Sequence, residues 1–258
     1  MTGFITRRAL LSGTSAAVAA VAMAEALRPH RRDAVEDHTA ASTVSRWALV
    51  VDRAQCARRK GCRACIDACH FAHGVSEQED IDRDIKWIWK EPARRAFPSQ
   101  PLSPGAHPDS PVVVLCNHCG SPPCARVCPT GATWQRPDGV VAMDPHRCMG
   151  CRYCMAACPY GARSFNWTRT PARGEQGKPG SYPGRTVGVV EKCTLCVDRL
   201  DAGLAPRCVE ACRVDGAGAL TFGDLADPTS RVRHLLATRH TLRRRPELGT
   251  RPHVFYLL

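Results

Sequence analysis

The chain has 258 residues, of which only 6% are aromatic, and it contains 20 glycines, 20 prolines and 16 cysteines. This is little apolar material for one large or two small domains. We therefore expect the fold to depend on covalent or metal cross-links and the metal-free chain to be largely unfolded. The formal net charge of +12 counts every cysteine as neutral, so it overstates the charge of a chain whose thiolates bind metal.

The first 26 residues match an export signal. Arg7 and Arg8 precede an uncharged, alanine-rich run over residues 9–24, and small residues suited to cleavage follow. This pattern resembles a twin-arginine (Tat) signal peptide, which predicts export of the folded protein to the periplasm. A membrane anchor is the alternative, but the run is shorter than the roughly 20 apolar residues that a span requires. Residues 27–45 have no apolar period, and we expect a flexible linker there.

Short runs of β-forming residues precede each group of cysteines. After two of the groups, at residues 129–133 and 159–164, we expect a short helix or turn and then a returning strand. Ile85–Trp89 also alternates like a strand. The runs that we expect to be strands are residues 47–51, 112–115, 140–143 and 187–190.

All 16 cysteines fall into four groups of four. The third group, Cys148, Cys151, Cys154 and Cys158 followed by Pro159, matches the bacterial ferredoxin spacing C-x2-C-x2-C-x3-C-P. In that motif three thiolates hold one 4Fe-4S cluster and the fourth reaches a second cluster, so one motif predicts another. The other groups are Cys56, Cys62, Cys65 and Cys69; Cys116, Cys119, Cys124 and Cys128; and Cys193, Cys196, Cys208 and Cys212.

An internal repeat links the second and third groups. The segment Cys128-Pro-Thr-Gly-Ala132 recurs as Cys158-Pro-Tyr-Gly-Ala162, which indicates two halves of one pseudo-symmetric unit. From the strands and this repeat we expect an α+β fold. Four 4Fe-4S clusters, each with four thiolates, would carry about −2 apiece, so the loaded protein would be only mildly basic.

Two other uses of the cysteines compete with clusters. Eight disulfides are compatible with an exported protein, but a disulfide framework gives no reason for cysteines to recur three residues apart beside Gly, Ala and Pro. Zinc sites usually join two separated C-x2-C pairs, and only the last group, with its eleven-residue gap, has that form. We therefore expect clusters.

Two stretches are typical of surface loops. Residues 91–111 contain six prolines, and residues 168–185 are rich in glycine and proline, so we expect both to be irregular. Trp87, Trp89 and Trp167 are expected to pack in the ordinary way, and the alternative is that they shield clusters from water or contact a partner.

Residues 231–258 form a basic C-terminal tail with seven arginines and one acidic residue, Glu247. We expect a solvated basic face or a docking patch for an acidic partner. Nucleic-acid binding is the alternative, but the tail has no interleaved aromatic residues or known motif, and we expect no such partner.

No catalytic residues are expected, because the chain offers no Ser-His-Asp set, phosphate loop or carboxylate pair. The haem attachment motif C-x-x-C-H is absent from the sequence. His70 and His118 adjoin cysteines, and we expect them to support the clusters or face solvent rather than bind iron. Four basic residues in or beside the motifs either raise the cluster potentials or simply point into solvent: Arg63, Arg126, Arg152 and Lys192.

The segment from Trp47 to Asp224 resembles the four-cluster ferredoxin-type iron-sulfur subunits of bacterial respiratory complexes, which are related to the β-subunits of molybdopterin oxidoreductases. Within this family it is most similar to the exported iron-sulfur subunit of the sulfite-reduction-associated Dsr membrane complex. The segments that carry the resemblance are Arg46–Asp52, Ala64–His70, Cys116–Cys124, Met155–Trp167, Val190–Cys196, Leu220–Asp224 and Leu248–Tyr256.

The resemblance implies two ferredoxin-like modules, one nested inside the other. Residues 46–111 and 186–230 would form the outer module, and residues 112–167 the inner one. The implied ligand sets are Cys56, Cys62, Cys65 and Cys212; Cys69, Cys193, Cys196 and Cys208; Cys116, Cys119, Cys124 and Cys158; and Cys128, Cys148, Cys151 and Cys154. The spacer after Cys56 and the segment from Cys212 to Gly218 depart from the family pattern, so a modified cluster would appear in the outer module.

The resemblance also implies a function. The protein would be a non-catalytic electron-transfer subunit, peripheral to the membrane, that relays electrons between a multi-span quinone-interacting subunit and another redox subunit such as a multihaem cytochrome. The alternative is the iron-sulfur β-subunit of an exported molybdopterin oxidoreductase, whose catalytic subunit would be the partner.

Overall fold

The computed structural model describes residues 44–75, 83–100, 107–168 and 186–258. The expected signal peptide, nearly all of the expected linker and all but the first residue of the 168–185 loop therefore lie outside the described residues. Among the described residues no helix is long and apolar enough to cross a membrane.

A four-stranded sheet is built around the first strand, β1 (Trp47–Asp52). β1 pairs antiparallel with β8 (Leu220–Asp224) on one side and parallel with β10 (Val254–Leu257) on the other. The short strand β9 (Thr241–Leu242) completes the sheet beside β10. Because neighbouring strand residues face opposite ways, Leu49 and Val51 join the core under the cysteine-bearing helices. Ala48 and Val50 face the other way, where Val232 of α9 (Arg231–Thr238) covers them.

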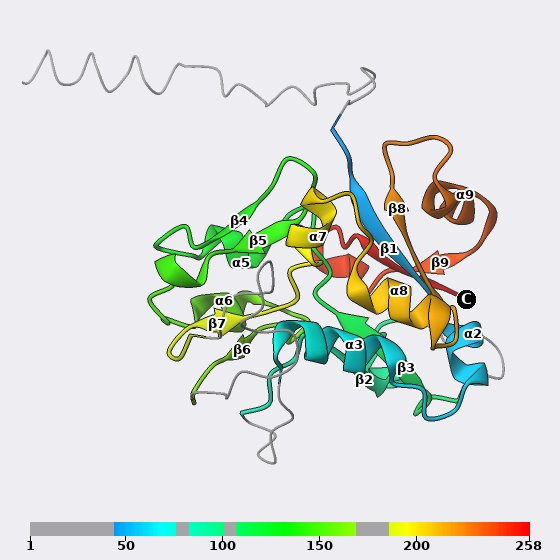
Figure 1. The fold of residues 1–258 in the computed structure, drawn as a ribbon, viewed down its shortest axis with the longest axis horizontal. Helices are drawn as coiled ribbons and strands as arrows, with labels where there is room; N and C mark the ends of the chain where they lie inside the picture. The colour runs from blue at the N-terminus through cyan, green and yellow to red at the C-terminus, as the bar shows by residue number, and fades with distance from the viewer. Residues whose placement is uncertain (1–43, 76–82, 101–106, 169–185) are drawn as a thin grey trace, which may run out of the picture. The chain divides into compact units, whose positions relative to one another are not determined.

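The remaining strands form three two-stranded sheets, and the cysteine-bearing helices lie among these sheets and beside the four-stranded one (Figure 1). Asp52 ends β1 and caps α2 (Arg53–Arg58) by accepting a hydrogen bond from the Gln55 amide at 2.8 Å. α3 (Ala64–His73) packs along α8 (Arg207–Val214), and α7 (Val197–Asp201) precedes α8. Two shorter helices, α5 (Pro123–Arg126) and α6 (Tyr153–Ala157), pack on each other at the left of the view.

The two-stranded sheets accompany these helices. They are β2 (Ile88–Pro92) with β3 (Pro111–Leu115), β4 (Thr133–Gln135) with β5 (Val141–Met143), and β6 (Ser164–Phe165) with β7 (Val190–Glu191). The remaining elements are α4 (Ala93–Ala96) and two 3-10 helices, η1 (Pro145–Arg147) and η2 (Pro246–Leu248).

The internal repeat in the sequence is also a repeat in conformation. Gly131 and Gly161 both have positive φ, at 63° and 61°, and each donates its amide to the carbonyl of the cysteine three residues earlier. The bonds are 3.2 Å to Cys128 and 3.4 Å to Cys158. After each turn the chain enters a strand, β4 or β6, as the sequence predicts. Glycine suits this position because it adopts positive φ without a Cβ clash.

Three local expectations need correction. The expected strand at 187–190 is shortened to β7, because residues 187–188 form a turn in which Gly188 has φ of 82°. The strand expected at 85–89 begins only at Ile88. Residues 91–111 are not all irregular loop: α4 lies within them, and Ala93, Ala96 and Phe97 are in the core with at most 2% of their surface exposed.

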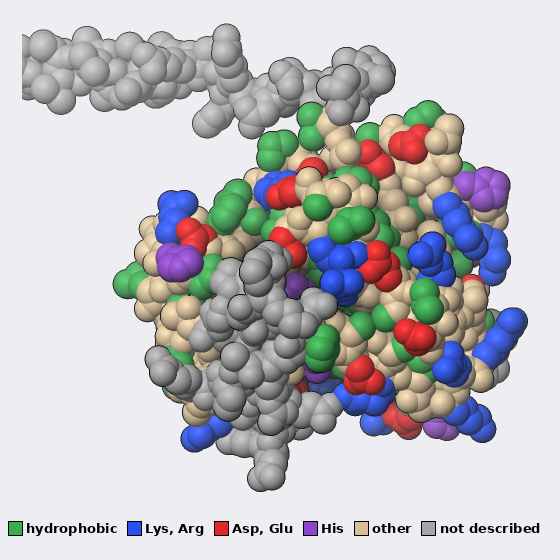
Figure 2. All heavy atoms as spheres, in the orientation of Figure 1, with side chains coloured by type: hydrophobic (Ala, Val, Ile, Leu, Met, Phe, Trp, Pro, Cys, Tyr) green, Lys and Arg blue, Asp and Glu red, His purple; other side chains and the backbone are tan. Residues whose placement is uncertain are grey.

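The C-terminal segment is likewise not only a solvated basic face. All four residues of β10 are buried, and Tyr256 packs edge-on against Phe97 with ring centroids 5.0 Å apart. Arg244 is only 2% exposed and forms an ion pair with Glu91. On the face in Figure 2, lysine and arginine side chains are interspersed with acidic ones.

Candidate metal centres

The first cysteine set joins the start of α3 to the end of α8. Burial, followed by the neighbouring thiols of Cys212, Cys56 and Cys62, raises the pKa of Cys65 to about 12. Lys90 reaches the same place, since its Nζ donates to the carbonyl of Cys62 at 2.5 Å. The structure thus brings together Cys56, Cys62, Cys65 and Cys212, which we call the first set.

The second set lies beside the first, on the same pair of helices. Burial, followed by the thiols of Cys193, Cys208 and Cys196, raises the pKa of Cys69 well above its ordinary value. An ion pair of 2.6 Å between Arg199 on α7 and Glu210 on α8 closes the eleven-residue gap within the last cysteine group. The members of the second set are Cys69, Cys193, Cys196 and Cys208.

The third and fourth sets are formed around α5 and α6. Burial, followed by interactions with Cys116, Cys124 and Cys158 among others, raises the pKa of Cys119 to about 12. A cavity next to this set is lined by the thiols of the remaining cysteines together with Met143 and Val190. The third set is Cys116, Cys119, Cys124 and Cys158, and the fourth is Cys128, Cys148, Cys151 and Cys154.

The four sets follow one another in a row. Cys208 of the second set interacts with Cys65 of the first, and Cys193 of the second interacts with Cys116 of the third. Cys154 of the fourth set interacts in turn with Cys124 of the third. The order in space is therefore first, second, third and fourth, although the order in sequence is different.

All 16 cysteines lie in the described residues, and every one is a free thiol. No disulfide framework is formed. In the described parts of the chain, no group of three or more His, Cys, Asp or Glu side chains is placed to hold a single metal ion.

Unusual backbone conformations turn the chain around the thiols. His118, Arg152, Leu195 and Cys196 are non-glycine residues with positive φ, and each lies inside a cysteine motif. In the last group, the amide of Leu195 donates to Cys193 Sγ at 3.3 Å. Such strained residues persist where the surrounding structure fixes them, and at Leu195 the conformation directs an amide toward sulfur.

The basic residues of the motifs separate into two kinds. Arg63, Arg126 and Arg152 are exposed, as the solvent interpretation expects. Arg152 also lies over the rings of Phe165 and Trp167, at 5.3 and 5.2 Å from their centroids. Lys192 is different, because only 2% of its surface is exposed.

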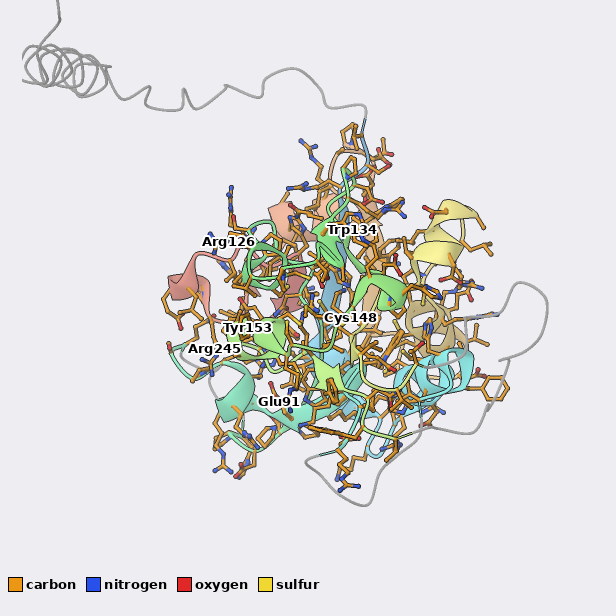
Figure 3. All side chains as sticks on the ribbon, turned by 90° about the vertical axis from the view of Figure 1, so that its left-hand side faces the viewer. Glu91, Arg126, Trp134, Cys148, Tyr153 and Arg245 are labelled. Carbon is orange, nitrogen blue, oxygen red and sulfur yellow. The ribbon has the colours of Figure 1, made fainter. Side chains whose placement is uncertain are left out.

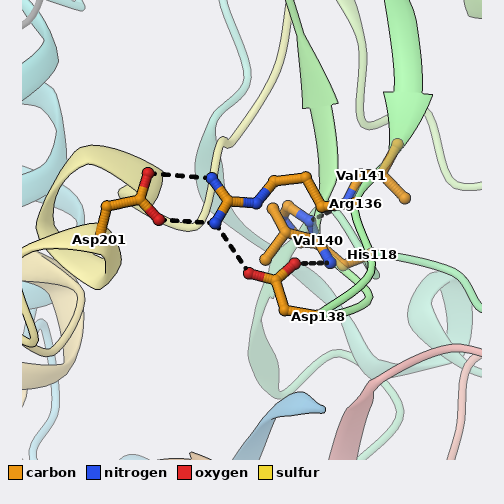
Figure 4. Close-up of polar contacts among 6 residues, drawn as sticks. All are labelled: His118, Arg136, Asp138, Val140, Val141 and Asp201. Carbon is orange, nitrogen blue, oxygen red and sulfur yellow. Dashed lines mark hydrogen bonds and ion pairs between the residues drawn. The ribbon is translucent and has the colours of Figure 1, made fainter. Parts of the chain in front are cut away.

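Lys192 and His118 act on Cys116 from two sides. Burial raises the pKa of the Cys116 thiol, but Lys192 and His118 outweigh burial. Together they hold this pKa well below its ordinary value. His118 is 2% exposed, and its Nδ1 accepts a hydrogen bond from the Val141 amide at 3.1 Å (Figure 4). Burial lowers the pKa of His118 itself. His70 is half-buried.

Arg163 and His73 lie beside thiols, and sequence reasoning did not identify either. Arg163 is 5% exposed, and although burial lowers its pKa, the thiols of Cys124, Cys154 and Cys116 raise it overall. His73 Nε2 is 3.4 Å from Cys196 Sγ, and its ring stacks on Trp87 with centroids 4.4 Å apart. Trp87 is buried in the core and reaches the thiols only through His73, while Trp167 is 48% exposed. The helical position of His73 carries no motif that could have marked it.

A surface clamp joins the inner and outer cysteine groups. Arg136, in the turn between β4 and β5, forms a two-bond ion pair with Asp201 at the end of α7, with distances of 2.6 and 3.0 Å (Figure 4). Arg136 also contacts Asp138 at 3.0 Å, and Asp138 accepts from the Val140 amide. This clamp holds the hairpin over His118 and against the helix that follows Cys196.

The fourth set lies close to the surface. Cys128, Cys148 and Cys151 are each partly exposed, whereas all four thiols of the second set are buried. Figure 3 shows Cys148 on the face that also carries Trp134 and Tyr153, which are 41% and 65% exposed. The fourth set therefore reaches the surface, as does the first through Cys56 and Cys62, which are partly exposed.

The donor sets fit iron-sulfur clusters. In the second set all four thiols are buried, and such closely grouped thiols cannot all ionise unless a cation compensates them; the iron of a cluster would supply that charge. Next to the thiols, both polar side-chain atoms of Asn117 and the hydroxyl of Thr194 are buried with no hydrogen-bond partner among the described residues. Buried polar groups are rarely left unpaired, and cluster sulfur would provide acceptors for their N–H and O–H donors.

Comparison with known proteins gives the same result. A family model described as a 4Fe-4S dicluster domain matches residues 112–174 and 181–225. The chain is 41% identical over 228 residues to the Hdr-like menaquinol oxidoreductase iron-sulfur subunit 1 of Archaeoglobus fulgidus, covering 82% of each chain. It is 37% identical over 214 residues to a tetrathionate reductase subunit of Salmonella typhimurium, covering 82% of this chain and 72% of that one.

A third relative is the iron-sulfur cluster-binding subunit of menaquinone reductase from Nitratidesulfovibrio vulgaris, which is 33% identical over 238 residues. That match covers 82% of this chain and 88% of the relative. The predicted cofactor is confirmed by these matches, and 16 cysteines suffice for four clusters. The α+β fold is confirmed as a ferredoxin-like 4Fe-4S dicluster domain of mixed helices and sheets. The chain thus belongs to the family of 4Fe-4S iron-sulfur subunits of oxidoreductases, and its function is electron transfer.

Proposed function

We propose that each of the four cysteine sets holds one 4Fe-4S cluster. The proposal is supported by the grouping of the thiols, in which Cys158 lies with Cys116, Cys119 and Cys124 rather than with the rest of its own motif. By the same criterion, Cys212 belongs with the cysteines of the first group, and Cys69 with those of the last. The outer and inner pairs of sets would then be two ferredoxin-like modules, one nested in the other.

Paired serine variants test the exchange of fourth ligands. Cys158→Ser and Cys119→Ser should alter the EPR signal of the same reduced cluster, because both remove a thiolate from the third set. Cys158→Ser and Cys148→Ser should alter different signals, although these two cysteines share a sequence motif. The proposal is wrong if Cys158→Ser and Cys148→Ser disturb one common cluster and Cys119→Ser another.

We further propose that the chain relays electrons between a quinone-reactive membrane subunit and another redox subunit. The relatives named for menaquinol oxidation and menaquinone reduction support the quinone side. A bound 4Fe-4S cluster with four thiolate ligands supplies one-electron redox chemistry and offers no open position for substrate. The single observation that carries the proposal is the continuous row of sets, each interacting with the next.

The chain's own residues perform three tasks in this function. The paired helices α3 and α8 and the sheet beneath them keep the second set dry, since all its thiols are buried. Amide and hydroxyl donors near the thiols, such as the Leu195 amide and the Thr130 hydroxyl 3.7 Å from Cys128 Sγ, stabilise negative charge on sulfur. The partly exposed thiols of the fourth set place one end of the row near a partner.

The alternative is the β-subunit of an exported molybdopterin oxidoreductase, and the matches to subunits of tetrathionate reductase and of a dimethyl sulfoxide reductase favour it. Purification of the tagged full-length chain from membranes in mild detergent separates the two. A multi-span protein with a multihaem cytochrome supports the relay, and a large molybdopterin subunit supports the alternative. Menaquinol should reduce the clusters in the purified complex but not in the isolated chain.

Within the family we propose a Tat-exported, Dsr-type subunit located in the periplasm. Support comes from the sequence alone, namely the twin arginines Arg7 and Arg8 and the resemblance described above. Replacing both arginines by lysine should retain the protein in the cytoplasm, with its clusters assembled. Normal periplasmic accumulation of that variant would refute Tat export.

A further inference from the structure

Lys192 is buried at the junction between the second and third sets. It directly precedes Cys193 of the second set, and its Nζ donates to the Cys193 carbonyl at 2.7 Å and to the Val141 carbonyl. Val141 in turn donates its amide to His118, within the motif of the third set. Only 2% of Lys192 is exposed, so its ammonium is fixed between two thiol sets and away from water.

Arg163 occupies the corresponding position between the third and fourth sets. Its Nη1 donates to the Thr133 hydroxyl at 3.2 Å and lies 3.7 Å from Met143 Sδ. Met143 also lines the cavity of the fourth set. The guanidinium interacts with both Cys124 of the third set and Cys154 of the fourth.

A buried positive charge favours the reduced form of a nearby cluster, because reduction adds a negative charge and the protein interior screens the attraction weakly. An exposed cation near a cysteine motif is screened by water and salt. A cation at a junction acts on the clusters on both sides. Arg126 lies two residues after Cys124 but is exposed, so its charge should have little effect on the cluster potentials.

We propose that Lys192 and Arg163 are charge-compensating residues shared by neighbouring clusters. Lys192 raises the reduction potentials of the second and third clusters together, and Arg163 raises those of the third and fourth. Electrons are thereby stabilised on both sides of these two junctions. This inference rests on the ligand sets proposed above.

The test is an anaerobic redox titration of the purified full-length holoprotein, followed by EPR. Lys192→Gln and Arg163→Gln remove the charge but keep a hydrogen-bond donor, whereas Lys192→Arg and Arg163→Lys keep the charge. Each Gln variant should lower two of the four reduction potentials. For each of these two clusters the equilibrium constant of one-electron reduction should fall about tenfold, which corresponds to a shift of ~59 mV. One potential should shift in both Gln variants, and it should belong to the cluster disturbed by Cys119→Ser. The charge-conserving variants and the control Arg126→Gln should keep wild-type potentials.

Iron content is measured first, and Lys192→Met and Arg163→Met provide second neutral variants if a Gln variant does not assemble. Neutral variants with full iron and four unshifted potentials would overturn the proposal while leaving the ligand sets intact. A shift of all four potentials, or of two non-overlapping pairs, would also overturn it. If the Cys119→Ser and Cys158→Ser signals differ, the ligand sets fail instead, independently of the potentials.

Discussion

Replacing Arg244 by Met tests whether the C-terminal segment is part of the core. The Arg244 side chain is 3% exposed and pairs with Glu91, which is 15% exposed, and its Nε donates to the Ala96 carbonyl at 3.3 Å. Its guanidinium also lies 5.4 Å from the centroid of the Tyr160 ring. Met keeps most of the apolar volume but leaves Glu91 buried without its partner, which costs about 3–5 kcal/mol. If the substitution destabilises the folded state but not the transition state, the unfolding rate increases by about 10²-fold or more.

Tightly bound cofactors prevent simple two-state unfolding, so the assay is the rate at which cluster absorbance disappears in anaerobic guanidinium. The control is Arg243→Met, since Arg243 is exposed and lies 4.6 Å from the Phe255 ring centroid. This contact is worth about 0.5–1 kcal/mol, so bleaching should accelerate less than tenfold. Adding Glu91→Gln to Arg244→Met should recover part of the loss, because both buried charges are then gone. Equal bleaching rates for Arg244→Met and Arg243→Met would refute the reasoning.

Three further predictions concern single residues. Gly150→Ala should lose the fourth cluster, lowering iron from about 16 to about 12 per chain, because Gly150 has φ of 74° and an added Cβ would lie 2.3 Å from the Gly188 carbonyl oxygen. The matched Gly161→Ala should keep its iron and lose about 1–2 kcal/mol of stability, because φ is 61° but an added Cβ would have no atom within 4 Å. Equal iron content in the two variants would contradict this prediction. Burial lowers the pKa of His253 from 6.5 to about 4, so between those values the unfolded chain binds a proton that the folded chain excludes, and stability falls as the pH is lowered. His253→Gln should therefore reduce the pH dependence of the bleaching rate between pH 6.5 and 5, and an unchanged pH dependence would count against it. Asp201→Asn should lower stability by less than about 1 kcal/mol, because the Asp201 side chain in its ion pair with Arg136 is 56% exposed. This small effect should shrink further in high salt.

The sequence predicted the features that depend on local spacing. The ferredoxin motif predicted the cofactor, and the repeat around Gly131 and Gly161 predicted two matching turns with returning strands. β1, β3 and most of β5 coincide with runs of β-forming residues. These features are determined by residues that are close in the chain.

Features that depend on distant contacts could not be predicted. Val254–Leu257 forms a parallel pair with β1, about 200 residues earlier, and nothing in the basic sequence around it indicates that partner. α4 has only four residues and no apolar period, so the surrounding prolines suggested a loop. Lys192 and Arg126 both lie in or beside cysteine motifs, but only Lys192 is buried, with its Nζ donating to the Val141 carbonyl of β5.

The central claim is that four cysteine sets together hold a row of four one-electron centres. A reductive titration of the anaerobically purified protein, with iron and acid-labile sulfide measured on the same sample, tests it most directly. We predict that each chain takes up about four electrons and contains about 16 iron and 16 sulfide. A folded, colourless protein, or one that carries full iron yet accepts fewer electrons than its cysteine sets allow, would contradict the account.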